Sequence, residues 1–415
     1  MPDVRPFRGL RYDPSAVPDL GTVLCPPYDV ISAAERLALA ARDPHNAVAL
    51  ELPEASSGGD AYASAARILG DWIADGTLRR DERPLVYVYE QRYSVAGGGQ
   101  RVARSLFCRL GLEQYGPASG IRPHERTMSG PKEDRFRLLR AVRTNLSPVL
   151  LLYDDGAGGA ASGRLLDALT EAPPAVCASG PDGVGQALWA IDPADSAPAT
   201  MLLELAARQP LSIADGHHRY ETALRYSAEP DAPPGANWVL ALLYDAHSGG
   251  LELRPWHRVI AGPVDGAGTI AAAGTVFGIE PVANSAELMA RLRLGDPAVP
   301  AGTLGLWTHA GGALLTVRSA LGARLDVDVL SDTLPQMIGS TTEQLSAAGR
   351  LSYVSDASSV IAGVDDGRAG VAFLLRPTPV ESVLSVAAAG GFMPAKSTWF
   401  GPKAATGLVF NPLFP

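Results

Sequence analysis

The sequence predicts a protein of α/β class with mixed sheets, in which strands and helices alternate along most of the chain. Apolar runs of strand length, such as 149–153, stand beside segments with apolar residues at helical spacing, such as 60–76. The chain has 415 residues, 47% of them hydrophobic and 19% charged, which is an ordinary globular composition. Because a domain usually holds roughly 100–200 residues, we expect two or three domains.

The first part of the chain is expected to contain two helices and a β-hairpin. Ser32 followed by Glu35 is a capping-box pattern, so a helix is expected to start there. Residues 60–76 have the apolar spacing of a second helix. Residues 84–93 and 102–112 have the composition of strands, and glycines lie between them, which predicts a hairpin.

The central part is expected to alternate between helix and strand. Residues 131–144 are rich in arginine and begin with Pro131 and acidic residues, which suits the dipole of a helix. Residues 149–153 follow as a short buried strand. We further expect a helix near 163–171, a strand near 185–191, a helix near 199–208 and a strand at 211–214.

The boundary between two regions is placed at the Pro- and Gly-rich stretch 262–268. Residues 1–261 are expected to form the catalytic or nucleotide-binding region, and residues 262–415 a C-terminal α/β region. A second hairpin is expected just before the boundary, with strands at 238–244 and 251–260. Beyond it we expect a strand at 371–375 and a helix at 379–389.

Charge and cysteine content favour a cytoplasmic protein that does not bind nucleic acid. The formal net charge is −9, whereas nucleic-acid binders are usually basic. The cysteines Cys25, Cys108 and Cys177 lie far apart, which disfavours a disulfide framework or a zinc knuckle. The N-terminus lacks the apolar core of a signal peptide, and no apolar run reaches the length of a membrane span.

The stretch 213–224 is the leading candidate for an anion-binding site. A short apolar strand runs into Asp215 and Gly216, and His217, His218 and Arg219 open a helix. The N-terminus of a helix presents free N–H groups and a positive dipole end to anions. The guanidinium group of arginine can bind phosphate through two parallel hydrogen bonds. The pattern favours phosphate or nucleotide contact, while metal ligation by the histidines and a purely structural cap remain as alternatives.

A second candidate is the stretch 124–135, which packs an acid, cations and hydroxyls into a loop that opens a helix. Glu125 is predicted to act as a general base and Lys132 as a phosphate clamp. Arg126 is assigned to substrate binding. The chain has no GxxxxGK[ST] pattern, so this is not a P-loop. The alternative interpretation is a solvated basic helix with a capped start.

A third candidate is the rigid, Pro-rich loop 393–403, in which Lys396, Ser397 and Thr398 are predicted to bind a substrate carboxylate or phosphate. A C-terminal segment tied onto a sheet, with its charges facing water, explains the same pattern equally well. Asp29, in the rigid turn after Pro26 and Pro27, is a further candidate carboxylate.

Taken together, these motifs resemble a bacterial family known as domain of unknown function 1015. The resemblance extends over nearly the whole chain. The combination of these motifs is specific for the family, although no single motif is. The segments that carry it are 26–31, 124–127, 130–135, 145–148, 215–220 and 393–398. The name of the family implies no activity.

The stretch 215–219 also looks like the matching segment of the archaeal free-serine kinase and the phosphate-binding box of ParB partition proteins. The ParB fold is shared with sulfiredoxin. This resemblance implies a ParB/sulfiredoxin-like nucleotide-binding core, elaborated with extra strands, in which Gly216, His217, His218 and Arg219 contact nucleotide phosphates. It also implies a catalytic carboxylate, for which Asp29 and Glu125 are the candidates. No cysteine near the motif matches that of sulfiredoxin.

The leading hypothesis is therefore a phosphotransferase that acts on a small hydroxylated metabolite, with free L-serine as the first candidate. ATP or ADP and Mg²⁺ are the expected cofactors, since nucleotide phosphates usually arrive with the metal. One alternative is a ParB-like nucleotide-binding regulator without turnover. A second alternative is a metal-dependent hydrolase with His217 and His218 as ligands. The sequence does not predict an oligomeric state.

Overall fold

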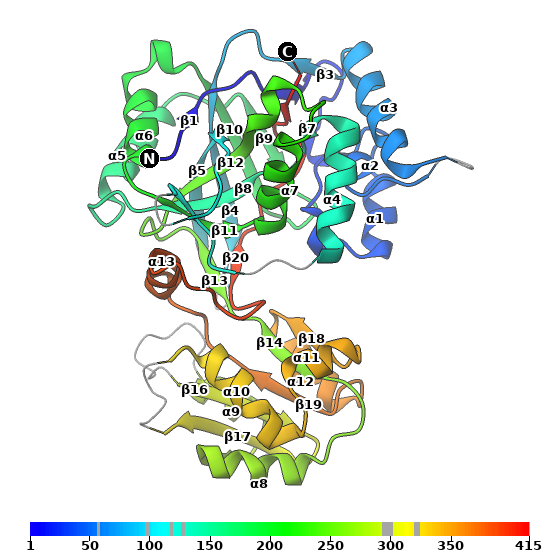
Figure 1. Ribbon diagram of the computed structural model, residues 1–415, viewed down its shortest axis with the longest axis vertical. Coiled ribbons are helices and arrows are strands. Elements are labelled where there is room, and N and C mark those ends of the chain that lie inside the picture. The colour runs from blue at the N-terminus through cyan, green and yellow to red at the C-terminus, as the bar shows by residue number, and fades with distance from the viewer. Residues whose placement is uncertain are drawn as a thin grey trace. The chain divides into compact units, whose positions relative to one another are not determined.

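The structure is a computed structural model that forms two compact units (Figure 1). Unit 1 comprises Met1–Glu252, Ala387–Gly390 and Gly401–Pro415. Unit 2 comprises Leu253–Val386 and Gly391–Phe400. The chain therefore returns to unit 1 for its C-terminal segment. The structure describes residues 1–55, 59–95, 99–116, 119–125, 129–292, 302–318 and 324–414.

Unit 1 is built on a large mixed sheet. The neighbouring strands β8 and β12 run parallel, as do β6 and β11, and the other pairs are antiparallel. This mixture confirms the predicted α/β class. In order across the sheet the strands are β6 (Ile121–Arg122), β11 (Leu211–Asp215), β8 (Val149–Tyr153), β12 (Trp238–Asp245), β5 (Gln100–Gly111), β4 (Val86–Ser94), β10 (Gly185–Ile191) and β9 (Val176–Ser179), and β1 (Val4–Arg5) also pairs with β5.

The two faces of this sheet are covered differently, because successive side chains of a strand point to opposite faces. On β4, Val86 and Val88 pack in a core cluster with four helices. Tyr87 and Tyr89 point the other way and pack in a cluster with the C-terminal residues Leu408 and Val409. The four helices are α4 (Ser129–Val142), α5 (Ala160–Leu169), α6 (Ala197–Ala207) and α7 (His217–Ser227).

The N-terminal helices of unit 1 form a separate cluster that also takes in Leu138 of α4 and Phe410. Ser32 caps α1 in a capping box with Glu35, as the sequence predicts. The elements of this region are β2 (Leu10–Tyr12), α1 (Ala33–Ala40), α2 (Val48–Glu51), α3 (Ala61–Ala74), β3 (Leu78–Arg80), β7 (Thr144–Asn145) and β21 (Asn411–Pro412), with 3₁₀ turns at Leu20–Thr22 and Tyr28–Val30. Two further 3₁₀ turns, Pro193–Asp195 and Pro234–Asn237, contact α6 and α7 respectively.

Unit 2 is an antiparallel sheet with helices. Strands β13 (Glu252–Arg254) and β20 (Trp399–Gly401) form a separate pair, and most of their residues belong to unit 2. The sheet order is β15 (Phe277–Val282), β17 (Gly311–Val317), β16 (Thr303–Thr308), β19 (Val371–Leu374), β14 (His257–Ile260) and β18 (Leu351–Val354), and the helices are α8 (Gly266–Val276), α9 (Ser285–Leu292), α10 (Asp326–Ile338), α11 (Thr342–Ala347), α12 (Ala357–Asp365) and α13 (Val380–Ala388).

The predicted hairpin at 238–260 is wrong. Its first half is β12, which lies between β5 and β8 in unit 1, and its last residues are β14, which lies in the sheet of unit 2. Apolar pattern predicts that a segment is a strand but not which strand it pairs with. The predicted boundary between residues 261 and 262 describes functional regions and stays a prediction. None of the helices described is long and apolar enough to cross a lipid bilayer.

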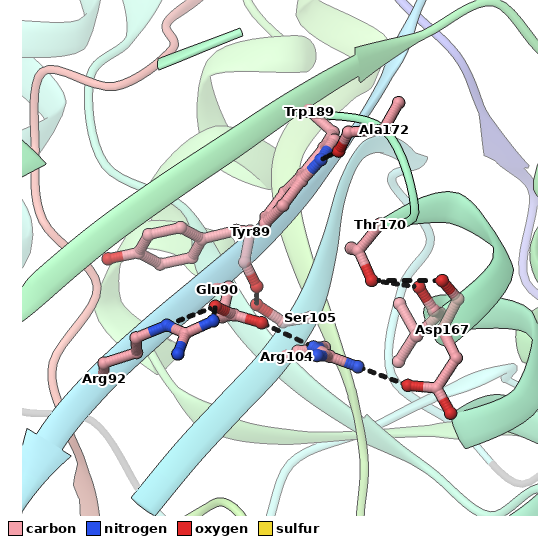
Figure 2. A network of polar contacts seen from close by, with 10 residues as sticks. Tyr89, Glu90, Arg92, Arg104, Ser105, Asp167, Thr170, Ala172 and Trp189 are labelled. Atoms are coloured by element: carbon pink, nitrogen blue, oxygen red, sulfur yellow. Dashed lines mark hydrogen bonds and ion pairs between the residues drawn. The ribbon is translucent and has the colours of Figure 1, made fainter. Parts of the chain in front are cut away.

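A buried carboxylate joins β4 to β5 and α5 (Figure 2). Glu90 is 1% exposed and accepts hydrogen bonds from Arg92 Nε at 2.7 Å and Arg104 Nε at 2.6 Å. Arg104 also reaches Asp167 on α5 at 2.5 Å. A charge buried in this way is tolerated because charged donors surround it.

Replacing Arg104 with Leu is expected to destabilise unit 1 by about 2 kcal/mol, since it removes a charged partner of a buried carboxylate. Asp167→Asn is the matched comparison, because the Asp167 side chain is 72% exposed. An exposed ion pair contributes less than about 1 kcal/mol. Hydrogen exchange of β4 and β5 peptides measures both losses. Equal losses in the two variants would contradict the importance of burial at Glu90.

Candidate functional site

The candidate site of unit 1 is built where β11 ends and α7 begins. Gly216 caps α7 with φ of +92°, a left-handed conformation that favours glycine. A Cβ at this position would lie 3.1 Å from Nε of Arg219, so glycine also makes room for that side chain. The turn leaves the first N–H groups of α7 at one spot, at the positive end of the helix dipole. This is the arrangement that the sequence predicts.

Asp215 holds two cations beside this helix start. Its Oδ2 accepts from Nη2 of Arg219 at 2.7 Å, and its Oδ1 accepts from Nζ of Lys403 at 3.0 Å. Arg219 also donates to the carbonyl of Pro148. Burial by itself would raise the pKa of Asp215, but the charges of Lys403 and Arg219 outweigh it and hold the pKa well below its ordinary value. Asp215 is therefore ionised at neutral pH, and it orients both cations.

A second arginine, Arg135, lines the same cavity as Arg219. Arg135 of α4 is 6% exposed and donates from Nη1 to the carbonyl of Glu51 at 2.8 Å. Its guanidinium stacks on the ring of Tyr28 at 4.2 Å from the centroid. Ser147 donates to Oε1 of Glu51 at 2.9 Å. Hydrogen bonds from both sides therefore position this buried pair.

Asp29 belongs electrostatically to the same cluster. Its side chain is exposed, in the 3₁₀ turn Tyr28–Val30. Burial would lower the pKa of Arg219, but Asp215 and then Asp29 outweigh it, so the pKa is raised. Arg219 therefore stays protonated, and the exposed carboxylate of Asp29 lies within range of its charge. The structure thus brings together Asp29 and the stretch 215–219, which are far apart in sequence.

The buried histidines His124 and His217 contact each other edge to face, with ring centroids 4.8 Å apart. Nδ1 of His124 lies 2.6 Å from the carbonyl of Ile213, to which it donates. Nε2 of His217 accepts from the backbone N–H of His124 at 3.4 Å. An accepting nitrogen carries no proton, so His217 is neutral in this arrangement.

Burial lowers the pKa of His124 to about 4, although its bond to Ile213 and the charge of Asp215 act in the opposite direction. Burial also lowers the pKa of His217 well below its ordinary value. Because the unfolded chain then binds the proton more readily, the contribution of these groups to stability is complete above pH ~6.5 and is lost as pH falls towards the folded pKa.

Unit 1 is therefore expected to lose about 3 kcal/mol from His124 alone between pH ~6.5 and ~4. Denaturant titrations at several pH values measure this loss. His124→Asn keeps an N–H donor for Ile213 but does not titrate, so the loss should shrink by the same amount. His309→Ala is the control, because His309 is exposed in unit 2. An unchanged pH profile in His124→Asn would contradict the assignment.

Two residues of the second predicted stretch lie close to α7. Lys132 forms an ion pair with Glu221, one turn into that helix. Glu125 is half-buried and follows His124 directly. Arg126 lies outside the described residues, so its predicted role in substrate binding stays a prediction.

The third predicted stretch is divided between the units, with residues 393–400 in unit 2 and residues 401–403 in unit 1. Ser397 and Thr398 are buried there, and the hydroxyl of Ser397 donates to the carbonyl of Pro394 at 2.5 Å. Lys396 has a φ of +58° and its ammonium lies 5.0 Å from the ring centroid of Trp256. The hydroxyl of Ser397 is thus engaged within its own loop. The predicted role of these residues in substrate binding stays a prediction.

A cavity of about 50 Å³ lies beneath the two arginines. Arg135, Arg219 and Thr222 contribute to its lining. The hydroxyl of Thr222 is buried and has no hydrogen-bond partner among the described residues. A cavity of this volume is large enough for a water molecule. The N-terminus of α7 and the two cations beside it form an arrangement that can bind an anion.

The metal-dependent alternative finds no support in these side chains. Within the parts of the chain that the structure describes, no three His, Cys, Asp or Glu side chains gather as a metal site. Both oxygens of Asp215 are bound by cations, and Nε2 of His217 is bound by a backbone N–H. A metal ion held by protein ligands alone would have to displace these partners.

A comparison with models of known protein families identifies the family of this chain. The model of a family described as a protein of unknown function (DUF1015) matches residues 4–327. The chain belongs to this family. The match spans unit 1 as far as Glu252 and continues into unit 2, so it includes both β11 and α7. No curated protein matches this DUF1015 chain.

Several solved structures are distantly similar to this DUF1015 protein. Free serine kinase in complex with AMP is 11% identical, with a TM-score of 0.38, and the match covers 68% of this chain and 84% of that one. A conserved hypothetical protein from Pyrococcus furiosus is 12% identical, with a TM-score of 0.37 and coverages of 68% and 87%. C-terminally truncated SbnI from Staphylococcus aureus is 11% identical, with a TM-score of 0.37 and coverages of 71% and 84%. Likeness at this level carries no argument about activity.

Proposed function

We propose that this protein transfers a phosphoryl group from a nucleotide to a hydroxyl group of a small metabolite, with L-serine as the first candidate. The observation that carries the proposal is the carboxylate of Asp215, which fixes Arg219 and Lys403 beside the N-terminus of α7. Phosphoryl transfer depends on positioning and on neutralising charge more than on covalent chemistry. Two oriented cations next to the N-terminus of a helix meet that need.

The roles follow from the position of each group. The N–H groups at Gly216, His217 and His218 would bind the phosphates, and Arg219 and Lys403 would neutralise charge as it moves to the leaving group. Asp29 or Glu125 would accept the proton of the acceptor hydroxyl. The acceptor oxygen then forms its bond to phosphorus, the bond between phosphorus and the leaving oxygen breaks, and the leaving nucleotide keeps that electron pair.

A Mg²⁺ ion carried by the nucleotide fits these residues in one way. Magnesium is usually held by one or two carboxylates together with substrate phosphates. Both oxygens of Asp215 are occupied by cations, whereas Asp29 is exposed. If Glu125 acts as the base, Asp29 would hold the ion, which supplies additional positive charge to the phosphates.

Phosphorus NMR tests the transfer itself. Purified protein with Mg²⁺, ATP and a pool of hydroxylated metabolites that includes L-serine is expected to give a new phosphomonoester signal. Lys403→Met is expected to slow its appearance about 100-fold, the usual effect of losing one donor to a developing charge. His309→Ala in unit 2 should leave the rate unchanged. Broadened nucleotide signals without a product would instead favour the regulator without turnover, and unchanged spectra would contradict both.

A pair of carboxamide substitutions tests the base. Asp29→Asn or Glu125→Gln is expected to lower kcat about 10²–10⁴-fold, the usual contribution of general acid–base catalysis. The residue that acts as the base should also lose the acidic limb of the pH–rate profile, which a merely structural residue would keep. Full activity in both variants would contradict the assignment of a carboxylate base to these positions.

A further inference from the structure

A second and larger cavity of unit 1 lies next to the candidate site. Its volume is about 310 Å³, and it lies among the N-terminal helices α1 and α3 and helix α4. Clefts that bind small molecules start at roughly 300 Å³. Its lining includes Arg36, Leu52, Glu54, Ala61, Tyr62 and Asp134.

Arg135 joins this cavity to the candidate site. It lines both the larger cavity and the small one beneath Arg219. The neighbouring residues Glu51 and Leu52 also connect the two cavities, because Glu51 lines the small cavity and Leu52 lines the large one. Tyr28, on which Arg135 stacks, precedes Ile31 in the wall of the large cavity by three residues. A ligand that reaches past Arg135 would therefore contact both.

The charges that line the large cavity are balanced in pairs. Arg36 is bonded to Glu54 at 2.6 Å, and Arg135 is bonded to Asp134 at 2.6 Å. Tyr62 donates its hydroxyl to the other oxygen of Asp134 at 2.9 Å. A phosphate gains little from arginines that carboxylates already neutralise, and those carboxylates repel it. The cavity therefore suits an uncharged group, in contrast to the N-terminus of α7.

We propose that this cavity binds the nucleoside part of the phosphate donor, with the base among its apolar walls and the phosphates extending past Arg135 to α7. Leu52 and Ala61 supply apolar surface. The carboxylates of Glu54 and Asp134, which are 64% and 47% exposed, supply acceptors for amino and hydroxyl groups. This assignment rests on the proposed function, because it assumes that the phosphates lie at Gly216 and Arg219.

Two matched ligands separate the cavity from the phosphate site. ADP and inorganic pyrophosphate share a diphosphate and differ in the nucleoside. In calorimetric titrations, wild-type protein is expected to bind ADP at least about tenfold more tightly than pyrophosphate, which corresponds to about 1.4 kcal/mol. Ala61→Phe fills the cavity from α3 and should remove this preference, leaving the affinity for pyrophosphate within about twofold. Ala63→Phe, at an exposed position of the same helix, should behave as wild type.

The outcomes distinguish the two proposals. If ADP and pyrophosphate bind wild type equally, the nucleoside assignment is wrong while the phosphate site stands. The assignment is also overturned if Ala61→Phe and Ala63→Phe both retain the preference for ADP. If neither ligand binds wild type, the phosphate site is itself wrong and the nucleoside assignment fails with it. Hydrogen exchange of α3 peptides shows whether each variant keeps its fold.

Discussion

Deletion of residues 404–415 is expected to leave unit 1 unfolded while unit 2 keeps its structure. The segment fills one face of the large sheet with Ala405, Leu408 and Val409, and it inserts Phe410, which is fully buried, into the cluster of the N-terminal helices. Truncating a large buried side chain costs about 2–5 kcal/mol. Several such losses together exceed the 5–15 kcal/mol by which a domain is usually stable.

A single substitution also tests the contribution of the C-terminal segment to the core of unit 1. Phe410→Ala is expected to destabilise unit 1 by about 3–5 kcal/mol. Phe392→Ala is the matched control, because Phe392 lies in unit 2 and is 46% exposed. Hydrogen exchange resolved by peptide follows the two units separately. Equal effects of the two substitutions on unit 1 would contradict the role of the C-terminal segment in its core.

The local elements could be predicted because their signals are local. The capping box at Ser32 and Glu35, the apolar spacing of α3, and the short strand that runs into Gly216 each depend on residues within one or two turns. The start of α7, which is the centre of the candidate site, was therefore visible in the sequence. The mixed α/β class followed from the alternation of such elements.

The partners of these elements could not be predicted in the same way. Lys403 reaches Asp215 from 188 residues away, and no periodicity connects them. Its backbone carbonyl accepts from Nε2 of Gln91 at 3.0 Å, and the next residue but one, Ala405, donates to the hydroxyl of Tyr89 at 3.3 Å. Both anchors lie on β4, so the position of Lys403 depends on the assembled sheet. Lys403 stood in a predicted substrate loop, but the sequence gives no sign of its pairing.

Glu51 and Arg135 were missed as a site pair for a related reason. The sequence predicts Arg135 only as part of a basic helix, yet it is buried and bonded to the carbonyl of Glu51. The burial of Arg135 is recognised only when the packing of α4 on α3 and α7 is known. The family resemblance includes the stretch 130–135, but it does not indicate which contact Arg135 makes.

Asp215→Asn is expected to destabilise unit 1 by about 3–5 kcal/mol, since it leaves two buried cations without their carboxylate. The side chains of Arg219 and Lys403 are only 13% and 14% exposed. Asp71→Asn is the matched control, because Asp71 pairs with Arg67 at the surface and should contribute less than about 1 kcal/mol. Binding of pyrophosphate should weaken along with stability, because the cations are no longer oriented.

The dependence of this loss on pH separates charge pairing from simple packing. The folded pKa of Asp215 is held below its ordinary value, so the carboxylate contributes stability that is complete above pH ~4 and is lost as pH falls through the folded pKa. The difference between wild type and Asp215→Asn should therefore narrow in acid. The double variant Asp215→Asn/Lys403→Met should lose less stability than the sum of the two single variants. In the double variant neither partner of the Asp215–Lys403 ion pair is left as an unpaired buried charge. Strictly additive losses with no pH dependence would mean that Asp215 packs the turn without orienting the cations, and the phosphate site would lose its central support.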